Sequence, residues 1–151
     1  MLNQDFKEFI QSLNANSVRY LLVGGYALAA HGHPRYTKDL DIWIDRDPAN
    51  ATNLVLALGQ FGFGSLGLTV DDFLLPDQVI QLGYPPIRID LLTSADGVEF
   101  SDCYEKHLTI EIEGVEISLI DRESLCQNKR ASGRMQDLAD IEAIEKLNND
   151  T

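Results

Sequence analysis

The sequence predicts an α/β or α+β fold in which helices cover one mixed β-sheet, with a single domain over residues 1–151. Three observations lead to this class. The chain of 151 residues is long enough to build one hydrophobic core without staples. Its hydrophobic content of 44% and charged content of 24% are ordinary for a globular protein. Short strand-like segments alternate with segments of helical spacing, and there is no internal repeat.

The first half of the chain is expected to alternate helices and strands. Apolar residues three or four apart indicate the first helix, and a largely apolar stretch indicates a buried strand after it. The doublet Gly24-Gly25 then interrupts the chain before an Ala-rich helix, and strict period-two alternation marks the next strand. Asp47-Pro48 places a proline near the first turn of a further helix. In order, the predicted segments are a helix at 4–14, a strand at 18–23, a helix at 26–31, a strand at 39–45, a helix at about 49–60 and a loop at 59–68.

The second half is expected to contain four strands and two helices. Two strands meet at the turn Tyr84-Pro85-Pro86, and two more form a hairpin around Glu113-Gly114. Asp121 is a good N-cap for the helix that comes next. A last amphipathic helix is marked by Met135, Leu138, Ile141, Ile144 and Leu147. The other predicted segments are strands at 78–83, 87–92, 107–112 and 115–119, and a helix at about 122–130.

The net charge of −12 argues against direct binding of a long nucleic acid. The sequence has 24 acidic and 12 basic residues, and its largest basic cluster is Lys129-Arg130 with Arg134. Nucleic-acid binders usually present a basic face, because neutralisation of phosphates supplies most of their affinity. A nucleotide carried by a divalent metal suits an acidic site, and a basic partner protein suits an acidic surface.

Three features predict a cytoplasmic protein. No apolar run approaches 18 residues, so no membrane span is expected. The N-terminal residues 1–5 lack a basic stretch followed by an apolar run, so no secretory signal is expected. Cys103 and Cys126 have no metal-like spacing and are interpreted as reduced thiols.

The strand predicted at 39–45 is the most informative segment. Residues two apart in a strand point to the same face, so Asp39 and Asp41 share one face while Leu40 points to the core. Two carboxylates at this spacing repel each other, and a hard divalent cation such as Mg²⁺ would offset the repulsion. The alternative is a solvated, acidic strand face. Trp43 shares the carboxylate face, where packing under a helix is favoured over stacking on a base.

A third carboxylate and a glycine pair have related positions. Asp90 alternates with apolar residues in the strand at 87–92, and it would join Asp39 and Asp41 if the two strands are neighbours. Gly24-Gly25 lies where a strand turns into a helix, so the backbone can approach a phosphate closely. A plain tight turn is the alternative interpretation of this doublet.

These residues together resemble a known signature. Gly24-Gly25, then Asp39-Leu40-Asp41-Ile42, then Asp90 on a later strand, is similar to the motif of polymerase-β-type nucleotidyltransferases. Ala27, His31, Arg35 and Thr37 before Asp39, and the run from Lys129 to Ile141, resemble the small AbiEii-like bacterial nucleotidyltransferases. The resemblance spans about Tyr20 to Ile144. It departs from the motif at Gly25, where many relatives carry a serine.

The resemblance implies a role for each matching residue. Asp39 and Asp41 would bind Mg²⁺ or Mn²⁺, and Asp90 would be the third carboxylate, as a metal ligand or as a base. Gly24 and Gly25 would contact the triphosphate of an NTP such as ATP. The cations expected near the phosphates, each with an ordinary ion-pair or solvated alternative, are Arg35, Lys129 and Arg134.

Three functions are consistent with these features. The favoured one is metal-dependent transfer of a nucleoside monophosphate from an NTP to a protein, RNA or small-molecule hydroxyl, with a place in a toxin–antitoxin module as one setting. The alternatives are an antitoxin-like module that binds a basic partner protein and a nucleotide-binding module without turnover. All three share the fold, so the fold does not choose between them.

Overall fold

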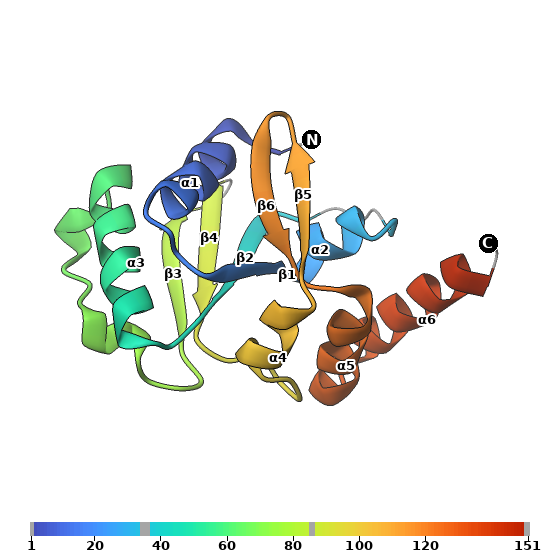
Figure 1. Ribbon diagram of the computed structural model, residues 1–151. Helices are drawn as coiled ribbons and strands as arrows, with labels where there is room; N and C mark the ends of the chain where they lie inside the picture. The colour runs from blue at the N-terminus through green and yellow to red at the C-terminus, as the bar shows by residue number, and fades with distance from the viewer. Residues whose placement is uncertain (1, 34–36, 85–86, 150–151) are drawn as a thin grey trace.

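Six strands form one mixed sheet at the centre of the molecule (Figure 1). The computed structural model describes residues 2–33, 37–84 and 87–149. The strand order is β3-β4-β2-β1-β6-β5. The strands are β1 (Tyr20–Val23), β2 (Asp39–Ile44), β3 (Val79–Tyr84), β4 (Ile87–Leu92), β5 (Leu108–Ile112) and β6 (Val115–Leu119). The expected mixed sheet is confirmed, because β2 runs parallel to β4 while β1 runs antiparallel to β2.

The helices connect the strands and cover the sheet (Figure 1). Helices α1 and α3 pack against each other, and the Ser12 hydroxyl of α1 donates a hydrogen bond to the Ala57 carbonyl of α3 at 3.0 Å. Helices α5 and α6 form a second packed pair. The helices are α1 (Gln4–Ala15), α2 (Gly24–Ala30), α3 (Pro48–Phe61), α4 (Phe100–Glu105), α5 (Arg122–Ser132) and α6 (Met135–Asn149), with 3-10 turns η1 (Gly64–Leu66) and η2 (Val70–Phe73).

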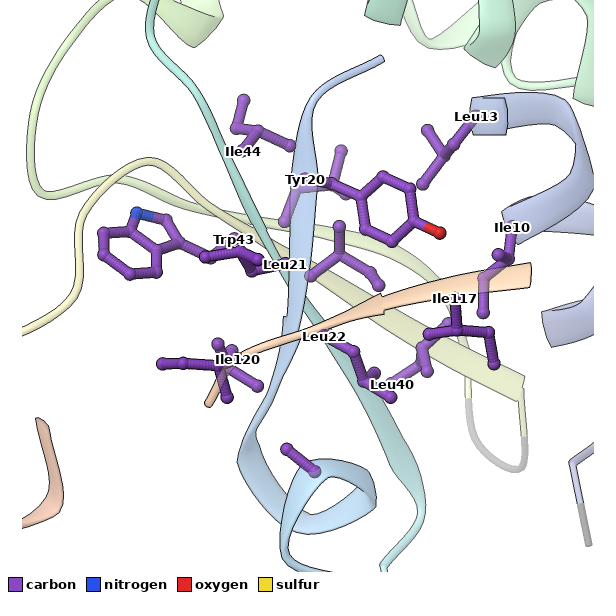
Figure 2. Close-up of a cluster of buried hydrophobic side chains, with 14 of the residues drawn as sticks. Ile10, Leu13, Tyr20, Leu21, Leu22, Leu40, Trp43, Ile44, Ile117 and Ile120 are labelled. Carbon is purple, nitrogen blue, oxygen red and sulfur yellow. The ribbon is translucent and has the colours of Figure 1, made fainter. Parts of the chain in front are cut away.

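Strand alternation sends the side chains of the sheet to two different environments. Figure 2 shows Ile10 and Leu13 of α1 directed toward Tyr20 and Ile117 on one side of β1, with the indole of Trp43 on the other. Trp43 is buried and its ring lies edge-on to Phe100 of α4, so packing is confirmed as its role. The core on the Tyr20 side anchors β1 and β2 and leaves the start of β2 open on the opposite face.

Most predicted elements are confirmed, with small shifts in their ends. Asp121 caps α5, because its carboxylate accepts a hydrogen bond from the Ser124 amide at 3.2 Å. Helix α2 begins at Gly24, two residues earlier than expected, so the glycine doublet belongs to the helix. The segment expected to be a loop at 59–68 holds the last turn of α3 and η1. Helix α4 was not predicted, and Pro85-Pro86 of the expected turn lie outside the described residues.

The apolar face predicted for α6 is confirmed at Ile141 and Ile144 and is wrong at its other three residues. Met135 is 88% exposed, and Leu138 and Leu147 are exposed as well. The residues of α6 that are buried are Asp137, Asp140, Ile141 and Ile144. The two carboxylates are buried together with Lys129 of α5, with which they pair.

Two smaller expectations concern the cysteines and the membrane. Cys103 and Cys126 are both buried and unpaired, as predicted. Within the described residues, every helix is too short or too polar to cross a lipid bilayer.

Candidate active site

The structure places the three predicted carboxylates on neighbouring strands. β2 pairs with β4 in a parallel register that sets Asp41 beside Asp90 and Asp39 beside Arg88. Residues in register on adjacent strands point to the same face of a sheet, so these four side chains share one face. The hypothesis that the two strands are neighbours is therefore confirmed, and the acidic residues gather where β2 begins.

Arg88 is a residue of the site that the sequence analysis did not single out. Its Nε donates a hydrogen bond to Asp90 Oδ1 and its Nη2 donates one to Asp90 Oδ2, both at 3.0 Å. Its Nε also lies 3.8 Å from Asp39 Oδ1. The signal was its place two residues before Asp90, since residues at that spacing share a strand face.

The donor set at the start of β2 fits a hard cation in part. Asp39 and Asp41 offer carboxylate oxygens, the ligands that Mg²⁺ and Mn²⁺ prefer. Among the described residues, however, no three His, Cys, Asp or Glu side chains are arranged closely enough to hold a metal ion. Both oxygens of Asp90 accept hydrogen bonds from Arg88.

Burial and neighbouring negative charges both act on the Asp41 carboxylate. Burial, followed by the charges of Asp90 and Asp39, raises the pKa of Asp41 from 3.8 to about 7, against the opposing effect of Arg88 and Lys129. The carboxylate is thus disfavoured as an anion unless a cation joins it. A divalent ion beside Asp41 would remove that penalty, which is the electrostatic reason for a metal at this place.

This shift predicts how the stability of the metal-free protein depends on pH. The folded state holds the Asp41 proton up to about pH 7, whereas the unfolded state releases it near pH 3.8. The free energy of unfolding of the wild type should therefore fall as pH rises from 3.8 to about 7, compared with that of Asp41→Asn. The fall should be at most about 1.4 kcal/mol per pH unit. Urea unfolding in EDTA at several pH values measures the difference. Parallel curves for the two proteins would contradict the assignment.

The glycine doublet is required by close packing on Asp41 and Thr37. A Cβ on Gly24 would stand 2.1 Å from Asp41 Oδ2, and a Cβ on Gly25 would stand 2.8 Å from Thr37 Cβ. Gly24 also has φ +71°, a conformation that L side chains rarely adopt. The doublet therefore forms the tight turn between strand and helix. The absence of a side chain at Gly24 also allows the Asp41 carboxylate to pack directly against the backbone.

Gly24→Ala should destabilise the protein more than an equivalent change elsewhere. Gly67 has φ +69°, but a Cβ added there would meet nothing within 4 Å, so Gly67→Ala isolates the backbone penalty of about 1 kcal/mol. Gly24→Ala adds the collision with Asp41, for a total of about 2 kcal/mol. Urea unfolding of the two variants gives the comparison. Equal losses would mean that the Asp41 carboxylate moves aside freely.

A pocket of about 720 Å³ lies over these residues. One side of its lining includes Gly24, Gly25, Asp39 and Asp41. The other side comes from α5 and the residues that follow it, and includes Asn128, Lys129, Ser132, Arg134 and Asp137. As the described residues define it, this lining does not include Asp90. Arg35 lies outside the described residues, so the structure does not place it. A larger hollow of about 1170 Å³ shares Asp77, Ser94, Ala95 and Asp96 with this pocket. Its lining contains neither the glycine doublet nor Asp39 and Asp41.

Lys129 reaches the pocket as part of a buried ion-pair network. Its Nζ donates hydrogen bonds to Asp137 Oδ1 at 3.0 Å and to Asp140 Oδ2 at 3.2 Å, and the residue is only 5% exposed. Burial raises the pKa of Asp137, but hydrogen bonds from Ser132, Lys129 and Arg134 outweigh it and lower the pKa to about 2. The solvated alternative for Lys129 is therefore wrong, whereas Arg134 stays largely exposed beside Asp137.

His31 and His33 have separate contacts. His31 is buried, and its Nε2 forms a hydrogen bond with the Ile120 carbonyl at 2.7 Å. His33 Nε2 lies 3.6 Å from Asp140 Oδ1, which links the loop after α2 to the Lys129 network.

Comparison with known proteins identifies the fold. No protein-family model and no curated protein matches the chain. The crystal structure of a "putative nucleotidyltransferase" from Thermotoga maritima matches with a TM-score of 0.55 and 15% sequence identity, covering 97% of this chain and 91% of that one. An antigenic nucleotidyltransferase-like protein from Paracoccidioides brasiliensis matches with a TM-score of 0.56 and 17% identity, covering 97% and 78%. The chain therefore has the nucleotidyltransferase fold.

Proposed function

We propose that this protein is a metal-dependent nucleotidyltransferase that transfers a nucleoside monophosphate from an NTP to an acceptor hydroxyl. The observation that carries the proposal is the meeting of Asp39 and Asp41 with the glycine doublet in one pocket, where the Asp41 carboxylate lies against Gly24. The nucleotidyltransferase fold supports the same chemistry. The acceptor is the hydroxyl of a protein, an RNA or a small molecule.

Each residue has a physical role in this proposal. Asp39 and Asp41 would hold Mg²⁺ or Mn²⁺, and the ion would supply positive charge to the phosphoryl group that is transferred. Gly24 and Gly25 leave backbone at the pocket wall, where a triphosphate can approach it closely. Lys129 has three N–H donors and directs two of them to carboxylates, which leaves one for a phosphate oxygen. Catalysis is then mainly positioning and charge stabilisation.

Nucleotide binding is the first test of this proposal. ATP, GTP, CTP and UTP are titrated calorimetrically into the protein with Mg²⁺ and with EDTA. Binding that requires the metal supports the proposal and ranks the bases. An NTP labelled at its α-phosphate then serves in a screen of protein, RNA and small-molecule acceptors, where transfer of label with release of pyrophosphate establishes the reaction. Failure of every nucleotide to bind with Mg²⁺ overturns it.

A nucleotide-binding module without turnover is the second candidate. The observation that favours it is the Arg88 fork, which occupies both oxygens of Asp90 and leaves Asp39 and Asp41 as the open carboxylates. Such a module binds an NTP with Mg²⁺ but releases no pyrophosphate with any acceptor in the screen.

A further inference from the structure

The contact between Arg88 and Asp90 differs from an ordinary surface ion pair. The guanidinium engages the carboxylate with two parallel hydrogen bonds at 3.0 Å, the arrangement that gives such pairs their strength and directionality. Asp90 is only 6% exposed, and the Arg88 side chain is 30% exposed. The pair is therefore partly desolvated, and replacing Arg88 by water would leave a buried carboxylate poorly solvated.

The charges around the pair show that Arg88 offsets negative charge that a divalent metal ion could otherwise offset. Asp39, Asp41 and Asp90 lie together, and Arg88 contacts two of them, at 3.0 Å and 3.8 Å. Lys129 faces the same cluster, but its charge is already matched by Asp137 and Asp140. Arg88 thus supplies one positive charge to a cluster of three carboxylates.

Asp90 lies next to residues of the pocket but, within the described residues, is not part of its lining. Asp39 and Asp41 line it and Asp90 does not, although Asp90 stands in register beside Asp41 on the next strand. Both oxygens that Asp90 could offer to a cation accept hydrogen bonds from Arg88. Release of the fork is the change that would let the third carboxylate join the other two.

We propose that Arg88 is a displaceable counter-ion that holds the Asp90 carboxylate in the metal-free protein and competes with a divalent cation for it. Arg88 is then a positioning residue, since it acts on the metal through Asp90. The inference rests on the proposed function in one respect, because it takes Asp39 and Asp41 to be the site of the cation. It adds that the strength of the hydrogen bonds between Arg88 and Asp90 sets the affinity of the site for the cation.

A bracing role for Arg88 would give the opposite result. If the fork served only to hold Asp90 in a geometry ready for the metal, removing it would weaken metal binding. Competition predicts tighter binding, because the cation no longer has to break two charge-assisted hydrogen bonds or repel a neighbouring positive charge. The sign of the change in affinity therefore separates the two roles.

The test measures Mn²⁺ affinity without nucleotide, from the free Mn²⁺ signal in electron paramagnetic resonance. We expect Arg88→Met to bind Mn²⁺ about tenfold more tightly than wild type, because it removes a nearby unit charge. Arg88→Lys should fall between them, since it keeps the charge but loses the fork. Arg19→Met is the matched control. It removes an arginine that pairs with Asp45 at 2.7 Å and Asp47 at 3.5 Å, beyond the other end of β2, and it should leave Mn²⁺ affinity unchanged.

A second measurement follows the arginine itself. The Nε–H resonance of Arg88, assigned by its loss in Arg88→Lys, should move to the position and exchange rate of a solvated guanidinium when Mg²⁺ is added. Circular dichroism and urea unfolding show that each variant is folded, so a loss of affinity through unfolding is recognised as such.

The outcomes separate this inference from the proposed function. Tighter Mn²⁺ binding by Arg88→Met with a moving Arg88 resonance supports the counter-ion role, even if no acceptor is found. Equal or weaker binding by a folded Arg88→Met overturns the role while leaving nucleotide transfer open. No Mn²⁺ binding by any of the proteins overturns both the counter-ion role and the metal site on which the proposed function depends.

Discussion

We expect Asp41→Asn to abolish metal-dependent nucleotide binding and to lower nucleotide transfer by at least about a hundredfold to a thousandfold, the usual cost of losing one electrostatic stabiliser in an active site. The amide keeps the shape of the side chain but removes the negative charge that draws the cation. The metal-free variant should be at least as stable as wild type at pH 8, because burial and the charges of Asp90 and Asp39 penalise the anion there. Loss of function would therefore not be loss of fold.

The control for this variant lies just beyond the end of the same strand. Asp45 follows the end of β2 and pairs with Arg19 at 2.7 Å, so Asp45→Asn removes a carboxylate outside the pocket. Calorimetric titration of NTP with Mg²⁺ should give wild-type affinity for Asp45→Asn and none for Asp41→Asn. If Asp41→Asn bound nucleotide with an unchanged requirement for Mg²⁺, the metal would have to be placed elsewhere.

Lys129→Met should lower the free energy of unfolding by about 3–5 kcal/mol, the typical cost of breaking a buried ion pair. The substitution leaves Asp137 and Asp140 buried without their shared ammonium, and Asp140 is 0% exposed. Methionine fills a similar volume, so the loss reports charge rather than a cavity. Urea unfolding at pH 7 measures it, and the loss should shrink at acidic pH, where the carboxylates can take up protons.

The neighbouring residue is the matched control for the lysine. Arg130 follows Lys129 on α5 and pairs with Glu145 of α6, but both of these side chains are about half exposed. Arg130→Met should change stability by no more than about 0.5 kcal/mol, as for most exposed ion pairs. If the two variants lost similar stability, the contacts of Lys129 with Asp137 and Asp140 would have to be as well solvated as a surface pair.

The positions of Asp39 and Asp41 could be predicted because strand alternation alone decides which face a residue occupies. Asp90 required one further assumption, that its strand lies next to β2, and the parallel register confirms it. The Arg88 fork could not be predicted in the same way. Both residues are visible in the sequence, but whether the guanidinium turns to Asp90, to Asp39 or to solvent depends on which side chains the neighbouring strand presents.

The Lys129 network escaped prediction for a different reason. Its partners are 8 and 11 residues further along the chain, beyond the spacing at which side chains meet on one helix. Gly133 has φ +69° and ends α5, so α6 folds back and brings Asp137 to Lys129. Without that reversal, Met135 and Leu138 predict the buried face of α6, and the expectation failed there. Helix α4 has six residues, and its Phe100 docks on Trp43, a tertiary contact with no local periodicity.

Helix α6 contributes to one wall of the pocket through Asp137. α6 packs mainly on α5 and extends away from the sheet (Figure 1), yet it carries Asp137 and Asp140, which fix the ammonium of Lys129. Because Asp137 and Asp140 hold the Lys129 ammonium, its position at the pocket depends on the docking of α6. A ligand that binds this ammonium would by linkage favour the docked state of α6.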